Sequence, residues 1–179
     1  MKKSLVLMAS LLTLSMLEST SLAAEPPTAE GRQKMALTHH KACKEGEPKA
    51  CTAFKAIWNG GNYEQGLNMY WQETGFVIAM GQLESAKPPW KVSATLVSLD
   101  GKPTYSPTDP GFWAFKTVTV DYPKVIMSGT FGALGEITFE GEVVDPKAEG
   151  EAVITGTVKR VKSGKTTTRK VRLETWPGD

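Results

Sequence analysis

The side chains best suited to chemistry lie in one short stretch, where two histidines precede two cysteines. His39, His40 and Cys43 fall within one predicted helix, and Cys51 follows shortly after. On a helix, His39 and Cys43 lie one turn apart on the same face, and imidazole and thiolate are ligands that zinc accepts. A closed zinc site needs four ligands, and the chain contains only these 2 histidines and 2 cysteines. The choice is therefore between a metal site and a Cys43–Cys51 disulfide.

The first 24 residues bear on that choice, because they resemble a secretory signal peptide in composition. Lys2 and Lys3 precede a short, mostly apolar run, and the small residues Ala23 and Ala24 offer cleavage points. That run is too short to remain as a membrane span, and no later stretch approaches about 18 continuous apolar residues. We therefore expect cleavage after Ala23 or Ala24, a periplasmic or secreted product, and no transmembrane anchor.

An oxidising compartment favours the disulfide over the metal site. Closing the nine-residue loop from Cys43 to Cys51 would add about 2.5 kcal/mol of stability in the chain-entropy treatment. His39 and His40 would then be exposed helical histidines beside a structural bridge. The sequence accordingly predicts neither a metal nor another cofactor.

Motifs for covalent or acid–base catalysis are weak in the rest of the chain. The Gly-x-Ser-x-Gly pattern of serine hydrolases is missing from the sequence. Glu136, Glu140 and Glu142 could supply a carboxylate pair, but their alternation with apolar residues marks the solvent face of a strand. We therefore predict no catalytic residue. The net charge of +2 also gives no general case for nucleic-acid binding.

Residues 25–73 have the helical periodicity of a small N-terminal unit. Helices are predicted over 29–45, 48–58 and 63–73. Thr28 is placed to cap the first helix, Pro48 suits the first turn of the second, and Asn62 can cap the third. Short turns between them allow antiparallel packing.

The cysteine-containing part of this unit resembles a known family. The stretch Lys41–Gly46 precedes Pro48–Cys51, and Phe54, Trp58–Gly61 and Tyr70–Trp71 follow. Over residues 32–73 this is similar to the cysteine-rich Sel-like repeats, tetratricopeptide-type helical hairpins of exported bacterial proteins. The resemblance implies a bridge between adjacent repeats and a role in protein–protein contacts. Those proteins stack several copies, and because no second copy occurs here, the unit must pack against the rest of the chain.

Residues 74–179 change to the two-residue period of β-strands. Strands are expected within 90–99, 112–121, 124–131, 136–144, 151–161 and 166–176, with turns at Asp100–Gly101, Tyr122–Pro123 and Ser163–Gly164. The segment from Gly75 to Met80 fits a strand or a continuation of the third helix. The fold class is therefore α+β, a disulfide-linked helical unit packed on an antiparallel β-meander that forms a small barrel or a sandwich.

Charge is distributed unevenly over the last strands. Residues 136–151 hold six acids and one base, whereas residues 159–172 hold no acid. The bases of the second segment are Lys159, Arg160, Lys162, Lys165, Arg169, Lys170 and Arg172. Pairing with the acidic strand is expected for Lys159 and Arg172, whereas the tip from Lys162 to Arg169, including Lys165, is a candidate contact surface.

Aromatic residues beside the proline-rich loop 102–111 form a second candidate surface. Tyr105, Phe112, Trp113 and Phe115 lie in or next to this loop, and Trp113 is the best placed for an exposed contact. The favoured function is binding of another protein, as an inhibitor, an immunity-like protein or an accessory subunit of an envelope complex. The alternative is a small barrel that carries an apolar or lipid-like ligand in a cavity lined by Phe112, Ile137, Phe139 and Val143. A hydrolase ranks third.

Overall fold

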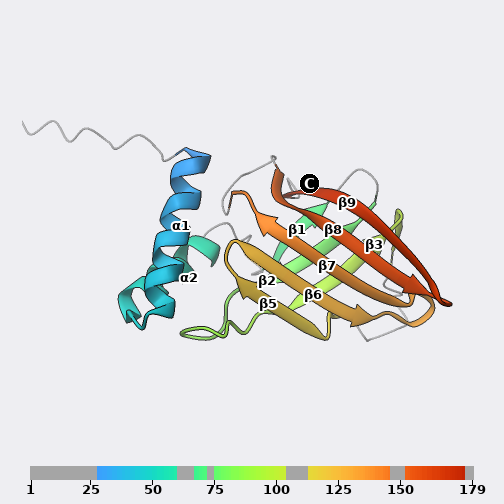
Figure 1. Ribbon diagram of the computed structural model, residues 1–179, viewed down its shortest axis with the longest axis horizontal. Helices are drawn as coiled ribbons and strands as arrows, with labels where there is room; N and C mark the ends of the chain where they lie inside the picture. Colours follow the sequence, from blue (N-terminus) through green and yellow to red (C-terminus); the bar gives the residue numbers. More distant parts are fainter. Residues whose placement is uncertain (1–27, 60–66, 72–74, 104–112, 146–151, 176–179) are drawn as a thin grey trace, which may run out of the picture.

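A computed structural model describes residues 28–59, 67–71, 75–103, 113–145 and 152–175 (Figure 1). Two helices precede a nine-stranded antiparallel sheet, so the fold class is α+β. The helices are α1 (Ala29–Lys44) and α2 (Pro48–Asn59), and a short 3-10 turn, η1, covers Gly132–Leu134. The strands are β1 (Leu67–Trp71), β2 (Val77–Gly81), β3 (Ala94–Leu99), β4 (Lys102–Pro103), β5 (Thr117–Asp121), β6 (Lys124–Thr130), β7 (Glu136–Val143), β8 (Ala152–Lys162) and β9 (Lys165–Thr175).

The two helices begin at the predicted residues and end within one residue of the predicted positions. The Thr28 hydroxyl accepts a hydrogen bond from the Gly31 amide at 3.1 Å, which satisfies one of the unpaired donors of the first turn. Gly46 follows α1 with φ of 99°, a conformation that glycine adopts without a steric penalty. Cys43 and Cys51 form the predicted disulfide and join the end of α1 to the first turn of α2.

The third helix predicted over 63–73 is wrong for Leu67–Trp71, which form strand β1. This strand pairs with β2, where Tyr70 lies opposite Ile78, and with β9, where Trp71 lies opposite Glu174. Aromatic residues favour strands, and pairing with distant segments outweighs a helical spacing of four apolar residues. Val77–Gly81 is also a strand, which resolves the alternative left open for that segment. The other residues of the predicted helix lie outside the described part.

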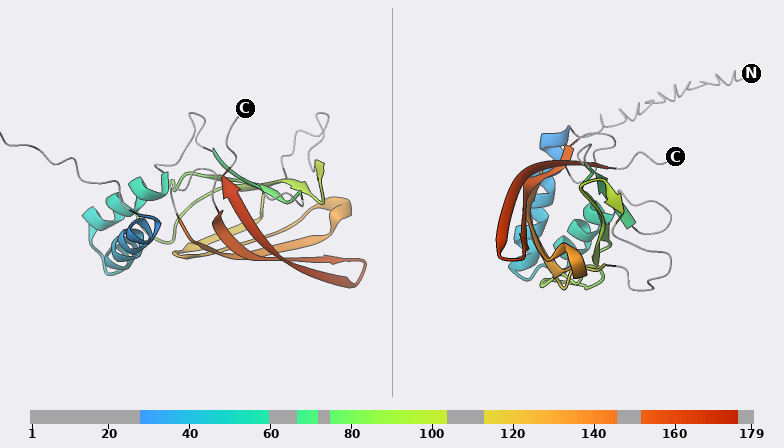
Figure 2. Two further views of the ribbon diagram at one scale, coloured as in Figure 1. Left: turned by 90° about the horizontal axis from the view of Figure 1, so that it is seen from above. Right: turned by 90° about the vertical axis from the view of Figure 1, so that its right-hand side faces the viewer.

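The sheet curls into a small barrel. Its strand order is β4-β3-β2-β1-β9-β8-β7-β6-β5, which is a meander in which the first strand, β1, neighbours the last, β9. Residues 113–115, just before β5, return to the side of β3 that faces away from β2, next to the first residues of β3. There the Leu96 amide donates to the Trp113 carbonyl at 3.0 Å, and the Phe115 amide donates to the Ala94 carbonyl at 2.9 Å. The end view in Figure 2 shows the resulting curvature.

Two tight turns of the barrel have the left-handed backbone that their sequences favour. Asp100 and Gly101 have φ of 56° and 70°, and Ser163 and Gly164 have φ of 49° and 75°. Two consecutive positive φ values define the two-residue turn that matches the twist of antiparallel strands. The predicted turns at both places are confirmed.

The interior of the barrel is packed with apolar side chains. Ile137, Phe139 and Val143, which alternate along β7, are buried as predicted, and the Phe76 and Phe139 ring centroids lie 6.0 Å apart. Ile137 and Phe139 have no accessible surface. A side chain bordering a space wide enough for water would retain some accessible surface, so these residues pack against other atoms.

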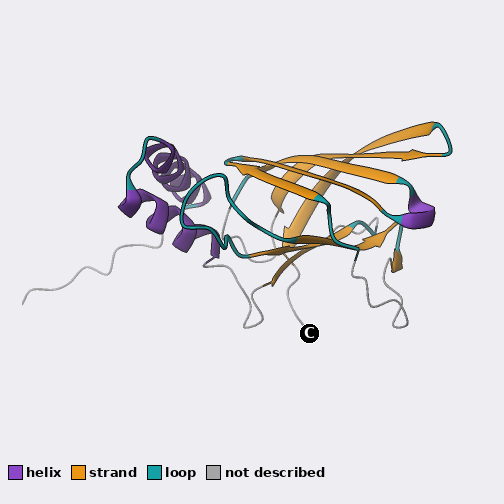
Figure 3. Cartoon of the chain, turned by 90° about the horizontal axis from the view of Figure 1, so that it is seen from below, coloured by secondary structure: helices purple, strands orange, loops and turns teal. Residues whose placement is uncertain are grey.

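The helices and the hairpin β8–β9 occupy opposite ends of the barrel. In Figures 1 and 3, α1 and α2 cover one end, and the β8–β9 hairpin extends beyond the other. Asn59 anchors α2 by accepting a hydrogen bond from the Leu83 amide at 3.0 Å, and Arg32 of α1 forms a two-pronged ion pair with the buried Asp145. The molecule therefore has one covered end and one end with a projecting ribbon.

Candidate functional site

The histidines and cysteines between His39 and Cys51 have structural roles. The two sulfurs are joined to each other and so are not thiolate ligands. His39 is half-buried, and His40 is only 3% exposed, which corrects the expectation that both are exposed. The sequence shows the helical position of His40 but not the barrel end against which it packs. Among the described residues, no three His, Cys, Asp or Glu side chains are grouped as a metal site.

His40 belongs to an aromatic cluster where the helices meet the barrel. The ring of Phe54, which has no accessible surface, lies 4.7 Å from His40 and 5.4 Å from both Trp90 and Tyr122, measured between centroids. Trp90 lies between β2 and β3, and Tyr122 lies in the turn between β5 and β6. The cluster therefore fixes the two helices on two loops of the barrel.

Burial also governs the ionisation of this cluster. Desolvation lowers the pKa of His40 below its ordinary value of 6.5, although nearby Asp121 opposes the shift, and Lys44 adds to it. Desolvation, with a smaller effect of Asp145, raises the pKa of Tyr122 to about 12. Burial therefore favours the neutral forms of His40 and Tyr122. The cluster serves to anchor the two helices on the barrel.

The lowered pKa of His40 predicts a pH-dependent stability. The unfolded chain binds a proton at His40 more readily than the folded chain, so acidification favours unfolding. This contribution to stability is complete above pH 6.5 and is lost as the pH falls from 6.5 through the lower pKa of the folded state. We expect His40→Phe to reduce the dependence of the unfolding free energy on pH between about 5 and 7, measured by urea denaturation. His39→Gln is the control, and an unchanged profile in His40→Phe would contradict the prediction.

The aromatic residues around 102–115 are only partly described. Trp113 is half-buried, with its ring centroid 6.1 Å from that of Phe131, and Phe115 is 6% exposed and packs edge-on against Phe131 at 5.1 Å. Phe115 is therefore part of the core, where it helps to close the barrel. Tyr105 and Phe112 lie outside the described residues.

The basic residues 159–172 are arranged differently from the sequence expectation. Lys159 lies opposite Thr138 on β7 and Thr168 on β9, and Arg172 lies opposite Thr155. None of the ion pairs of the described residues joins Lys159 or Arg172 to an acid. The expected pairing of these two residues with the acidic strand is therefore not found among the described residues, because strand register, and not proximity in sequence, decides which side chains face each other.

A three-residue ionic cluster lies at the hairpin end of the barrel. Asp100 accepts from Arg169 Nη1 at 3.0 Å and from Arg160 Nη1 at 3.3 Å, and Arg160 Nε donates to the Leu134 carbonyl at 2.8 Å. The Arg169 guanidinium also lies over the Phe76 ring, 5.8 Å from its centroid. One carboxylate thus serves two guanidiniums. In the sequence, Asp100 is recognisable only as a turn residue, and nothing in its local context indicates that it pairs with two arginines.

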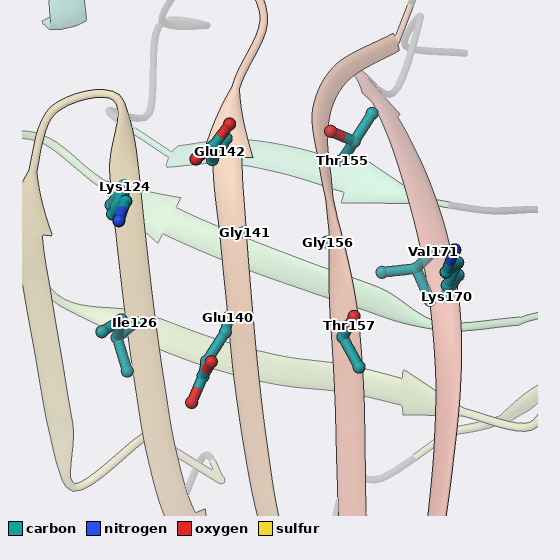
Figure 4. A pocket seen from close by; sticks show the side chains of 10 residues that line it. All are labelled: Lys124, Ile126, Glu140, Gly141, Glu142, Thr155, Gly156, Thr157, Lys170 and Val171. Carbon is teal, nitrogen blue, oxygen red and sulfur yellow. The ribbon is translucent and has the colours of Figure 1, made fainter.

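The outer face of the sheet holds a shallow groove of about 540 Å³ across β6 to β9 (Figure 4). Glu140, Glu142, Lys124 and Lys170 surround its centre, where two glycines face each other. The mixture of acids and bases gives the groove no preferred sign of charge. Because its lining comes from a regular sheet surface, we assign the groove no binding role.

One of these glycines, Gly156, is required by the close approach of β7 and β8. A Cβ at this position would lie 2.4 Å from the Glu140 carbonyl oxygen and 2.7 Å from Gly141 Cα. Both are backbone atoms that cannot move without disturbing the sheet. We expect Gly156→Ala to lower the free energy of unfolding by about 1–3 kcal/mol in urea denaturation. The neighbouring Thr157→Val, on the outer face, is the control, and equal stability of both variants would contradict this.

No helix within the described residues is both long and apolar enough to cross a bilayer. The resemblance of residues 32–73 to Sel-like repeats stays a prediction. Comparison with known proteins finds no matching protein family, no matching curated protein and no matching solved structure.

Proposed function

We propose that this chain is an exported protein that acts by binding another protein through the basic ribbon, defined as residues 159–172 of β8 and β9. The signal-like segment 1–24 and the Cys43–Cys51 bridge support export, because such bridges persist in oxidising compartments. The helical unit and the barrel serve as the scaffold that holds the ribbon.

The main support for this proposal is the surplus of cations on the basic ribbon. Of its seven basic residues, only Arg160 and Arg169 form ion pairs with described residues, and they share Asp100. The other five bases, which lack an ion pair within the described part of the chain, are Lys159, Lys162, Lys165, Lys170 and Arg172. All five are exposed. A surface of one sign attracts and orients a partner of the opposite sign.

The packing of the barrel supports a surface role over a ligand carrier. A carrier of an apolar or lipid-like molecule requires a lumen of several hundred Å³. Ile137 and Phe139, which would line that lumen, have no accessible surface, and Val143 is 3% exposed. The side chains that a carrier would turn toward its ligand instead belong to the packed core of the barrel.

The test is co-purification followed by charge reversal. The full chain, expressed with its leader in a bacterial host, should be recovered from the periplasm. Its intact mass should match a polypeptide that starts directly after Ala23 or Ala24. A polypeptide that co-purifies in stoichiometric amount should bind the Lys162→Glu/Lys165→Glu variant about tenfold or more weakly than it binds the unmodified protein. Its affinity should also fall with increasing salt.

Lys34→Glu/Lys49→Glu, on exposed positions of α1 and α2, is the matched control because it changes the net charge equally. Equal loss of affinity in both double variants would show a nonspecific charge effect and would overturn the proposal. Retention of the partner by the ribbon variant, or recovery of a lipid without a polypeptide, would overturn it as well.

A further inference from the structure

One edge of the basic ribbon has no neighbouring strand in the described structure. Strand β9 runs from Lys165 to Thr175, but β1 pairs with it only where Tyr70 meets Thr175 and Trp71 meets Glu174. The other side of β9 pairs with β8 along its length. Along Lys165–Arg169, which we call the β9 edge, no described strand lies on the side away from β8.

The hairpin geometry identifies the backbone groups that this edge presents. The two-residue turn at Ser163–Gly164 places Lys162 opposite Lys165 as the first pair. In such a hairpin the closing pair exchanges hydrogen bonds, and every second residue thereafter does the same. The N–H and C=O groups of Thr166 and Thr168 therefore point away from β8.

The composition of the edge suits an added strand. Thr166, Thr167 and Thr168 are β-branched, which favours extended backbone, and the edge contains no proline. Thr166 and Thr168 are exposed. An extended peptide can pair with such an edge through its main chain, and the flanking side chains then select its sequence.

The flanking charges select an acidic strand. Lys165 and Arg169 lie on the inner face of the hairpin, and Lys170 lies on the outer face at the end of the edge. Lysines on edge strands also discourage pairing between identical copies, because like charges then face each other. A second copy of this hairpin would bring cations close to cations, whereas an added strand with acidic residues on both of its faces would face the cations of both faces.

Arg169 offers an additional donor beside the edge. Its Nη1 donates to Asp100 at 3.0 Å, while its buried Nη2 has no hydrogen-bond partner among the described residues. A buried donor without a partner is costly, and a guanidinium accommodates a carboxylate through two parallel hydrogen bonds. An incoming carboxylate that displaced Asp100 would satisfy both nitrogens.

We propose that the β9 edge binds an extended acidic segment of the partner protein by strand addition. This inference rests on the proposed binding through the basic ribbon and specifies its mode. The main chain of the segment pairs with Thr166 and Thr168, and its carboxylates face Lys165, Arg169 and Lys170.

The first test uses a synthetic peptide in which each valine is followed by two glutamates, so that an extended strand carries acids on both faces, and the peptide is titrated against the full-length folded protein. Thr168→Pro removes an outward-facing N–H without removing a bond to β8, so it should weaken binding by about tenfold, while Thr168→Ala should retain affinity. Lys165→Glu/Lys170→Glu should weaken binding at least as much. Fluorescence anisotropy of a labelled peptide measures these affinities. If Thr168→Pro and Thr168→Ala bind the peptide with equal affinity, strand addition is overturned.

A second measurement keeps the test valid if Thr168→Pro does not fold. The same peptide, N-methylated at successive residues so that neither edge can donate hydrogen bonds, should bind the unmodified protein about tenfold more weakly than the unmethylated peptide. Vesicles containing phosphatidylglycerol serve as the competing anionic probe. Binding to the vesicles without binding to the peptide would overturn the inference in favour of a lipid surface.

The outcomes separate this inference from the proposed function. If the co-purified partner is lost on charge reversal of the ribbon but retained by Thr168→Pro, the ribbon is the binding surface and strand addition is wrong. If the partner is retained by the charge-reversed ribbon, the proposed function fails first, and the edge has no role in its binding.

Discussion

Phe54→Ala is expected to lower the free energy of unfolding by about 3–5 kcal/mol, the largest effect of any single substitution considered for this protein. Phe54 has no accessible surface and contacts His40, Trp90 and Tyr122, so its ring joins both helices to two loops of the barrel. Truncation removes the buried ring and leaves a cavity that the surrounding rigid rings cannot fill. Urea denaturation followed by tryptophan fluorescence measures the loss.

Leu37→Ala is the matched control, since Leu37 lies on α1 and is 39% exposed. Its cost should be well below that of Phe54→Ala, because Leu37 keeps part of its apolar surface in water and its truncation leaves no enclosed cavity. A loss below about 1 kcal/mol for Phe54→Ala would mean that the helices contribute little to the stability of the barrel.

Removal of the disulfide is the second large effect expected. Cys43→Ala/Cys51→Ala should lower the free energy of unfolding by about 2–5 kcal/mol, because the bridge restricts the unfolded chain around the turn between α1 and α2. Both sulfurs are buried, so replacement also removes packing. The double variant avoids a lone reactive thiol. Chemical denaturation with and without a reducing agent measures the effect.

Reduction supplies the internal check on this prediction. The reducing agent should destabilise the native protein by an amount similar to the double substitution and should leave the double variant unchanged. Equal stability of the native protein in reduced and oxidised form would contradict the prediction.

Local sequence predicted the elements whose conformation depends on adjacent residues. The Thr28 cap, the Gly46 termination and the Ser163–Gly164 turn involve backbone preferences within a few positions, and all three are found. The alternation along β7 predicted its buried face because that face meets a single, continuous core. The disulfide was predicted from the two cysteines together with the expectation of export to an oxidising compartment.

Features that depend on distant segments were not predictable in the same way. Leu67–Trp71 has helical spacing, yet it lies between β2 and β9 and becomes a strand. His40 is buried because Trp90 and Tyr122, far along the chain, form the surface that receives it. Because periodicity describes one element at a time, it does not identify the element packed against it.

The sequence predicted the charge of the candidate site but not its geometry. The excess of bases over 159–172 is a property of composition, and the sequence identified Lys165 and Arg169 from it. The Asp100 pairing, and the part of β9 that has no described strand beside it, depend on strand register and on where β1 meets β9. Neither can be read from charges counted along the chain.

The adjacency of β1 and β9 has a consequence for how the molecule folds. Tyr70 and Thr175 are cross-strand neighbours, so the wall of the barrel cannot close until nearly the whole polypeptide is present. Such distant contacts slow folding because a long loop must be ordered before they form. Because a chain is synthesised from its N-terminus, the helical hairpin can form early, whereas the barrel closes only once Thr175 is available.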